Sequence, residues 1–186
     1  MIYILPTDTC FGLGCEVSDP KSYEKIYEIK KRDKSKPLSI MVPSFSWLEK
    51  NTDLTKQQID FLRNYKEPFT VLAGCDYLKI WINFVNEEEN EEFFNRDIYE
   101  KFAFRVANNE TQEKLLKETG PIFLTSANPS KNPEIYNFSE IEKYFGNLIE
   151  KGKIKFLGPK KDLIKTKPSE IFEFVGESLE KNILRK

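Results

Sequence analysis

Basic side chains gather in one short segment, Lys30-Lys31-Arg32-Asp33-Lys34-Ser35-Lys36-Pro37. A polyphosphate is held by several cations that converge on one place, because an arginine offers a fixed fork to two oxygens and a lysine acts as a movable point charge. Most runs of this kind are solvated surface. This one stands directly before the apolar segment 38–42, so we expect a phosphate-binding loop between a helix and a strand.

Two further polar segments each follow a short apolar one. Pro6-Thr7-Asp8-Thr9 comes after residues 2–5, and Thr125-Ser126-Ala127-Asn128 follows an apolar run that begins at Ile122. Ligands of α/β proteins bind at the carboxyl ends of the strands, where hydroxyls, amides and carboxylates can contact a phosphate, a ribose or a base. Turn formation and helix capping use the same residue types, and both interpretations stay open here.

Arg105 interrupts the apolar segment Phe102-Ala103-Phe104-Arg105-Val106. A charged side chain in a strand that otherwise belongs to the core must find an anion, because burying an unpaired charge is costly. A carboxylate of the protein itself would satisfy it, and a carboxylate of a substrate would serve equally well.

The chain contains no histidine, and this absence limits the chemistry. It excludes Ser-His-Asp and Cys-His nucleophiles and most zinc sites. The three cysteines, Cys10, Cys15 and Cys75, are odd in number and form no C-x-x-C pair, which favours reduced thiols in a reducing compartment. Catalysis must therefore rely on Lys, Arg, Asp, Glu, Ser or Thr side chains, on backbone groups or on a bound ion.

The elements that must position these residues alternate along the chain. Asp19-Pro20 is an N-cap and a first helical position, so a helix is expected from there to about Arg32. Hydrophobic spacing predicts strands over 2–5, 38–42, 69–73, 78–85, 102–106, 122–125, 154–157, 171–175 and 182–185, and helices over 55–65, 110–119 and 139–145. The acidic run 87–92 is expected to be a loop or the start of a helix. Interleaved strands and helices predict one α/β domain with a mixed, twisted sheet over residues 1–186.

Taken in order, five segments resemble the YrdC/Sua5 family. The family pattern is a P-T-[DE]-T segment with a glycine turn, a K-x-R loop, a strand like A-V-R-V, an [ST]-S-A-N segment and a late P-S-E-I segment. These correspond here to 6–14, 30–38, 103–106, 125–128 and 168–171. Each motif is weak alone, but five in register over nearly the whole chain are specific. The resemblance implies a single-domain YrdC-like fold, a twisted mixed sheet flanked by helices.

The resemblance also implies a reaction, that of L-threonylcarbamoyladenylate synthase, a nucleotidyltransferase. L-threonine and bicarbonate form a carbamate, which attacks the α-phosphorus of ATP to give threonylcarbamoyl-AMP and pyrophosphate. The product serves the N6-threonylcarbamoyladenosine modification of tRNA through a downstream tRNA threonylcarbamoyl-transferase complex. Such a transfer needs alignment and charge neutralisation more than acid–base groups, which suits a chain without histidine.

Residue roles follow from the matched motifs. Mg²⁺ is expected with ATP, bound mainly through the phosphates rather than by the protein. The resemblance implies triphosphate binding and catalysis by Lys30 and Arg32, triphosphate binding by Lys36, further nucleotide contacts by Ser126, Asn128 and Arg185, and threonine binding by Thr9, Arg105 and Ser169.

The chain also departs from the family pattern. Members usually carry a helix and a strand before the first motif, so we expect either another element on that edge of the sheet or an open edge. Glu67 and Lys131 stand where the family has glycines.

Two alternative functions remain open. The lysines of 151–167 would suit a non-catalytic module that binds double-stranded RNA. A paralogue that acts on another carbamoyl substrate is the second alternative. The start of the sequence has no basic leader, and no apolar stretch is long enough for a membrane, so a cytoplasmic location is expected.

Overall fold

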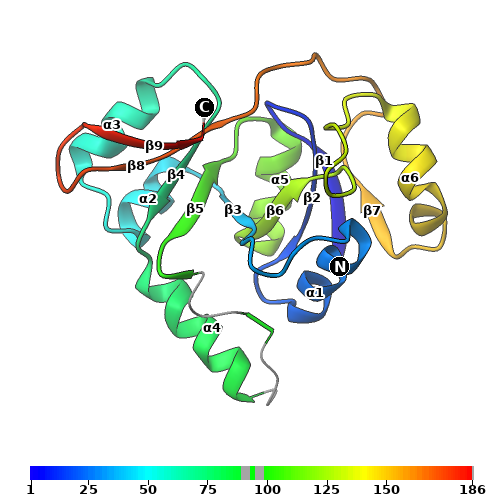
Figure 1. Ribbon diagram of the computed structural model, residues 1–186, viewed down its shortest axis with the longest axis horizontal. Helices are drawn as coiled ribbons and strands as arrows, with labels where there is room; N and C mark the ends of the chain where they lie inside the picture. The colour runs from blue at the N-terminus through cyan, green and yellow to red at the C-terminus, as the bar shows by residue number, and fades with distance from the viewer. Residues whose placement is uncertain (89–92, 95–98, 186) are drawn as a thin grey trace.

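One twisted sheet of nine strands runs through the part of the chain that the computed structural model describes, residues 1–88, 93–94 and 99–185 (Figure 1). The strands are β1 (Ile2–Pro6), β2 (Phe11–Glu16), β3 (Ser39–Val42), β4 (Phe69–Ala73), β5 (Phe102–Val106), β6 (Ile122–Ser126), β7 (Ile154–Phe156), β8 (Glu170–Phe174) and β9 (Lys181–Arg185). Their order is β7-β1-β2-β6-β3-β5-β4-β8-β9, with parallel and antiparallel neighbours. The predicted α/β class with a mixed sheet is confirmed.

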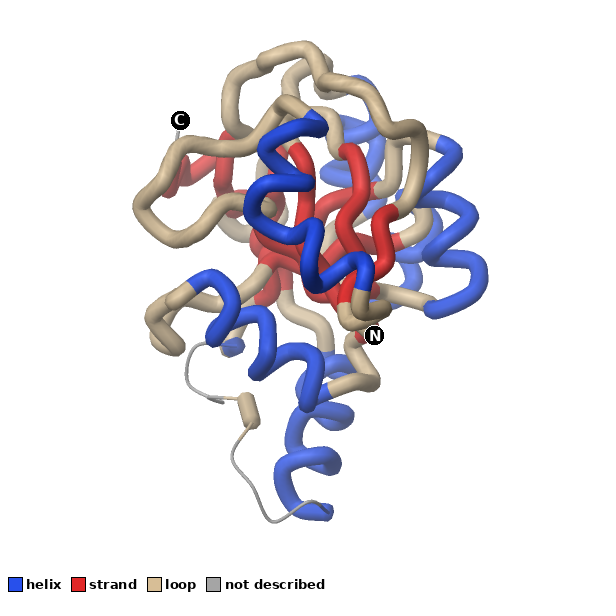
Figure 2. The backbone as a smooth tube through the Cα atoms, turned by 90° about the vertical axis from the view of Figure 1, so that its right-hand side faces the viewer, coloured by secondary structure: helices blue, strands red, loops and turns tan. Residues whose placement is uncertain are grey.

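Helices flank this sheet, and Figure 2 shows the strands enclosed between them. They are α1 (Pro20–Lys30), α2 (Phe45–Asn51), α3 (Lys56–Asn64), α4 (Asp76–Glu88), α5 (Glu110–Thr119) and α6 (Phe138–Glu150). The Asp19 side chain caps α1 by accepting the amide of Ser22, as the sequence predicts. Thr55 and Gln58 form a reciprocal capping box on α3.

Alternation along the strands separates the main core from the opposite face. In β5, Phe102 and Phe104 are fully buried in the main core, so Ala103 and Arg105 point to the other side of the sheet. On that other side, Leu115 and Leu116 of α5 pack with apolar residues of β1, β3 and β6 in a second, smaller cluster. Helix α5 covers only part of this face, and the rest of it forms a cavity.

One predicted strand is wrong. Residues 78–85 belong to helix α4. Leu78 and Ile82 are buried, while Ile80 is 69% exposed, so the buried positions recur every four residues rather than every two. The acidic run divides at the end of this helix: Glu87 and Glu88 belong to α4, and 89–92 lie outside the described residues.

Two elements were not expected from the sequence. Strand β2 has glycines at its alternate positions, which hides the pattern of its core residues Phe11, Leu13 and Cys15. Helix α2 is short and begins after Ser44, whose side chain accepts the amide of Trp47.

The outer edge of β1 is covered by β7. Ile2 pairs with Ile154 in a parallel ladder, so a later part of the chain occupies the edge for which another element was expected.

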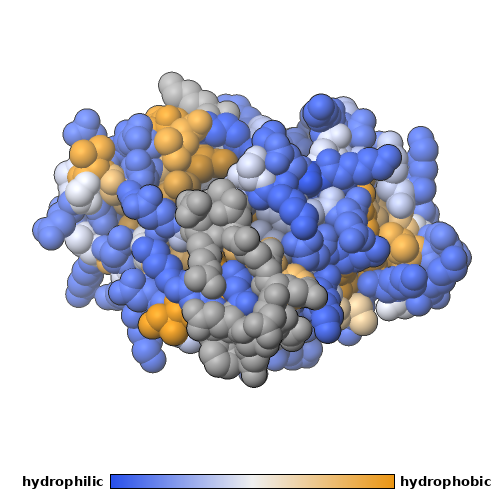
Figure 3. Space-filling view, turned by 60° about the horizontal axis from the view of Figure 1, so that its bottom comes forward, coloured by the Kyte–Doolittle hydropathy of each residue, from blue (hydrophilic) through white to orange (hydrophobic). Residues whose placement is uncertain are grey.

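The surface is strongly hydrophilic on the side shown in Figure 3, where apolar side chains gather only in small separate groups. In the described part of the chain, no helix has the length and apolar character needed to cross a membrane.

Gly14 lets β2 approach β6 closely. A Cβ at this position would lie 2.3 Å from the carbonyl oxygen of Phe123, which belongs to the neighbouring backbone. We expect Gly14→Ala to lower the free energy of unfolding by about 2 kcal/mol or more. Gly146→Ala is the matched control: it lies in α6, a Cβ there would meet nothing within 4 Å, and a gain of about 0.5–1 kcal/mol is expected. Urea denaturation measures both, and equal effects would contradict the packing argument.

Candidate active site

A cavity of about 370 Å³ lies on the face of the sheet that α5 leaves partly uncovered. Its charged lining consists of Arg32, Lys101, Arg105 and Arg185, with Glu134 as the acid among the described residues that line it. The remaining lining residues are Thr7, Thr9, Cys10, Gly12, Pro37, Ser39, Thr70, Leu72, Ala103, Leu124, Thr125, Ser126, Pro168, Ser169, Ile171 and Leu184. Four cations against one acid favour an anionic ligand.

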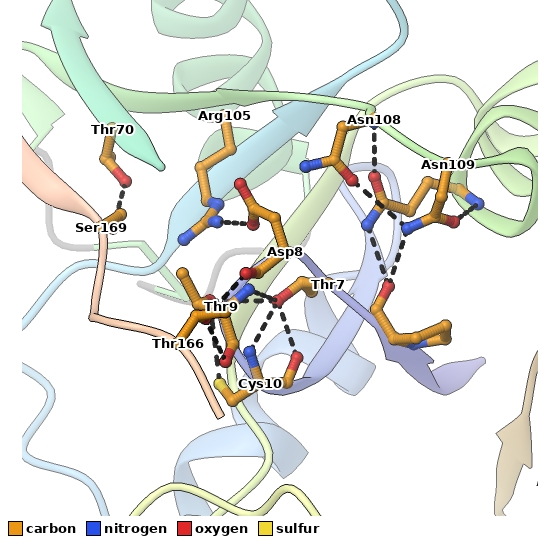
Figure 4. A network of polar contacts seen from close by, with 12 residues as sticks. Thr7, Asp8, Thr9, Cys10, Thr70, Arg105, Asn108, Asn109, Thr166 and Ser169 are labelled. Carbon is orange, nitrogen blue, oxygen red and sulfur yellow. Dashed lines mark hydrogen bonds and ion pairs between the residues drawn. The ribbon is translucent and has the colours of Figure 1, made fainter. Parts of the chain in front are cut away.

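The loop after β1 forms one wall of the cavity (Figure 4). The Thr7 hydroxyl donates to the carbonyl of Cys10 at 2.7 Å and accepts the amides of Thr9 and Cys10, each at 3.2 Å. From α5, Gln112 Nε2 donates to the carbonyl of Pro6 at 2.9 Å. The hydroxyl of Thr166, in the connection before β8, donates to the carbonyls of Asp8 and Thr9 at 2.8 and 3.1 Å. This loop is therefore held by its own hydrogen bonds and by two other parts of the chain.

Arg105 points into the cavity and is paired with an acid of that loop. Its Nη2 donates to Oδ1 of Asp8, and the arginine side chain is only 12% exposed. The sequence left open whether Arg105 meets a protein carboxylate or a substrate. In the structure it meets the protein carboxylate, and it still lines the cavity.

Two hydroxyls and a second arginine stand on the opposite wall. Thr70 and Ser169 lie 3.0 Å apart, and Arg185 Nη2 donates to both the carbonyl and the hydroxyl of Ser169, at 3.0 and 3.1 Å. Burial lowers the pKa of Arg185, and the nearby Arg105 also lowers it while Glu134 raises it. Strand β9 thus brings Arg185 beside Ser169, which directly precedes β8.

A buried set of tyrosine hydroxyls holds the basic loop. The Tyr23 hydroxyl lies 2.9 Å from that of Tyr27 and 2.7 Å from that of Tyr99. Tyr27 donates to the carbonyl of Lys36 at 2.9 Å, and Tyr99 accepts the amide of Leu38 at 3.3 Å. The backbone on either side of Pro37 is therefore fixed from the core.

Within this loop, Arg32 and Lys36 point to different places. Arg32 lines the cavity and donates to the carbonyls of Lys36 and Pro37, at 3.1 and 3.0 Å. The side chain of Lys36 is exposed and does not line the cavity.

Lys30 is buried beside the cavity and does not line it; its side chain connects α1 to the segment around Ser126. It is 2% exposed, and its ammonium donates to the carbonyls of Ser126 and Asn128. Burial is the main cause that lowers the pKa of Lys30 to about 8, and the positive charge of Arg32 adds to it. The side chain of Asn128 is also buried, and its Oδ1 has no hydrogen-bond partner in the described protein.

Three charged residues at or beside the cavity, Lys101, Asp8 and Glu134, were not assigned a role from the sequence. Lys101 directly precedes β5 and continues the alternation of Ala103 and Arg105, so this spacing could have indicated it. Asp8 belongs to the polar segment 6–9, whose composition fits a turn as well as a site. Glu134 follows the serine–alanine–asparagine motif in an irregular stretch, and no pattern in the sequence marks it.

The Cys10 thiol and the acidic side chains limit what the described part of the cavity can do. Burial raises the pKa of the Cys10 thiol to about 11, so it is not a thiolate at neutral pH. No three His, Cys, Asp or Glu side chains of the described residues gather as metal ligands. The site is suited to binding and aligning anions, with backbone-anchored arginines and hydroxyls.

Comparisons with known proteins identify the family and its fold. The family model Sua5/YciO/YrdC, described as "Telomere recombination", matches residues 1–186. The chain belongs to the Sua5/YciO/YrdC family. The resemblance read from its five motifs is thereby confirmed.

Two curated members of the Sua5/YciO/YrdC family, both named threonylcarbamoyl-AMP synthase, illustrate the similarity. The protein of Vibrio campbellii is 25% identical over 150 residues, which is 77% of this chain and 74% of the relative. That of Marinobacter nauticus is 27% identical over 173 residues, 91% of this chain and 83% of the relative.

Solved structures of the family have the same fold. Sua5 of P. abyssi, complexed with L-threonine, aligns with a TM-score of 0.72 and 24% identity over 99% of this chain. The chain spans about half of that protein, 49% of its length. YciO of E. coli aligns with a TM-score of 0.70 and 17% identity, over 100% of this chain and 82% of YciO. At these identities the likeness concerns the fold alone.

The buried ammonium of Lys30 predicts a pH dependence. Its folded-state pKa of about 8 lies below the ordinary 10.5, so the unfolded chain binds more protons and stability rises with pH in this window. Between about pH 7 and pH 9.5 the native protein should gain about 2 kcal/mol relative to Lys30→Met. Chemical denaturation of both proteins across this range measures the difference. If the free energies of unfolding of the two proteins change with pH in the same way, Lys30 does not titrate between about pH 7 and pH 9.5.

Proposed function

We propose that this chain is a threonylcarbamoyl-AMP synthase that uses ATP, L-threonine and bicarbonate. The observation that carries the proposal is the cavity, in which backbone-anchored arginines and hydroxyls from the family's motifs converge. The curated relatives, which carry this activity in their names, support it.

The polyphosphate is assigned to the side of the basic loop. The Arg32 guanidinium is the cation of this loop that lines the cavity, and Ser126 lines the adjacent wall. Lys36 is exposed and would reach the phosphates only from the mouth of the cavity. Lys30 would act chiefly by fixing the Ser126–Asn128 segment, because its ammonium is already bonded to two carbonyls. Arg185 is assigned to the nucleotide from the opposite wall.

The amino acid is assigned to the wall formed by β4, β5 and β8. Arg105 would bind the threonine carboxylate, and Ser169 would add a hydrogen bond, since its hydroxyl lies 3.0 Å from that of Thr70 in the cavity wall. Thr9, on the loop opposite, would contact the threonine side chain or its carbamate.

The reaction proceeds in two steps that these residues align. The ammonium group of threonine and bicarbonate form a carbamate and release water and one proton. A carbamate oxygen then attacks the α-phosphorus, the bond to the bridging oxygen breaks, and pyrophosphate leaves with the electron pair. Negative charge that builds up on the phosphates would be stabilised by Arg32 and Arg185. Mg²⁺ fits as an ATP-bound ion, because the lining offers only Glu134 as an acid among the described residues.

We further propose that the product passes to a tRNA threonylcarbamoyl-transferase complex in the cytoplasm. The lysines of 151–167 are all exposed and would suit contact with RNA. This segment includes the connection that reaches the cavity at Thr166, so RNA contact and synthesis are compatible.

The first test is pyrophosphate release by the purified protein with ATP, Mg²⁺ and bicarbonate. We expect release that requires both L-threonine and bicarbonate and that is clearly slower with L-serine. A folded protein that binds ATP but releases no pyrophosphate would indicate another carbamoyl substrate. A folded protein that binds no ATP would favour an RNA-binding role.

Arg32→Ala tests the assignment of the phosphate side. Removal of its charged fork should lower kcat/KM for ATP by about 100-fold, because a charge-assisted hydrogen bond contributes about 1.5–3 kcal/mol. Arg63→Ala is the control: this arginine lies in α3, away from the cavity, and should change kcat/KM by less than about twofold. Equal activity of the two variants would show that Arg32 does not contact the nucleotide.

A further inference from the structure

We infer that Asp8 is a specificity determinant for the amine of the substrate: it receives the ammonium group of the amino acid while Arg105 receives its carboxylate. The inference rests on the proposed function and adds to it a residue with no assigned role. Its starting point is the ion pair between Asp8 and Arg105 beside the cavity (Figure 4).

Both partners of this pair keep free bonding capacity. A guanidinium has five N–H donors, and the hydrogen bond to Asp8 uses only Nη2 of Arg105. Among the described residues, no other side chain binds this guanidinium, and Oδ2 of Asp8 receives no donor. Asp8 is 29% exposed, so a ligand can reach its carboxylate. One ligand can therefore contact both charges without breaking the pair.

The pair matches an α-amino acid in charge and in size. A zwitterion carries one positive and one negative group, and its nitrogen lies only about 2.5 Å from the carboxylate carbon. With its carboxylate on Arg105, such a ligand places its ammonium near the acid that Arg105 already contacts. A carboxylate without an amine would meet the same arginine but would leave Asp8 without a cation.

The structure holds Asp8 in place and separates it from the other acid of the site. Its carbonyl accepts from Thr166 at 2.8 Å, and the Thr7 hydroxyl closes the turn on its other side. Glu134 accepts from the Tyr136 hydroxyl at 3.1 Å and forms no ion pair with Arg105. Asp8 is thus the acid positioned to bind the ammonium group of an amino acid whose carboxylate is bound to Arg105.

The test compares L-threonine with its analogue in which a hydroxyl replaces the amine. Isothermal titration calorimetry measures both affinities with Mg²⁺ and α,β-methylene-ATP present and bicarbonate absent. The unaltered protein should bind threonine about tenfold or more tighter than the analogue. In Asp8→Asn this preference should fall to less than about threefold, while the affinity for the analogue is retained. Circular dichroism melting checks that each variant is folded.

Asp19→Asn is the matched control. Asp19 is 27% exposed and ion-paired with the N-terminal ammonium, and asparagine can still cap α1. This variant should keep the full preference for threonine. If Asp8→Asn weakens both ligands by one factor, Asp8 only orients Arg105, and the inference is wrong. It is also wrong if Asp8→Asn keeps the preference. Failure of the unaltered protein to bind threonine would contradict the proposed function and the inference with it.

Discussion

The arrangement of the site depends on the hydrogen bonds that the buried ammonium of Lys30 donates to two backbone carbonyls. A lysine at the end of α1 reaches the carbonyls of Ser126 and Asn128, and in return its own carbonyl accepts the amide of Ser130. Three hydrogen bonds thus join the start of the basic loop to the end of β6 and the segment that follows it. Hydrogen bonds from a charged donor are among the stronger ones in a protein, and they are needed here to offset the cost of burying the charge. Arg32 follows two residues later, so the hydrogen bonds of Lys30 also fix where Arg32 enters the cavity lining.

The four cations that line the cavity fall into two kinds, ion-paired and held by neutral groups. Lys101 is neutralised by Glu173 at 2.6 Å, and Arg105 by Asp8. Arg32 is bonded to backbone carbonyls rather than to an acid, and Arg185 to Ser169. Guanidinium groups held by neutral partners keep their full charge for a ligand, whereas paired ones are better suited to ligands that carry both signs.

Much of the fold could be predicted because strand alternation and helix caps are local. Asp19-Pro20 and the alternation in β5 both hold in the structure. The helix α4 was mistaken for a strand because a short apolar run fits both periods, and only burial decides between them. The site was predicted less completely. Motifs identify which segments meet, but they do not show that the Lys30 side chain turns inward, because this depends on carbonyls nearly a hundred positions away in sequence.

The β8–β9 hairpin is synthesised last of the elements that form the site, so it also affects when the site can form. The wall opposite the Thr7–Cys10 loop depends on Arg185, so the first and the last parts of the described chain meet across one cavity. A chain grows on the ribosome by about 5–20 residues per second. Several seconds therefore pass between the synthesis of the first strands and that of Arg185. Until β9 emerges, the nascent chain carries a sheet without its final arginine. The contact of Arg185 with Ser169 is thus absent from the cavity wall until β9 has paired with β8.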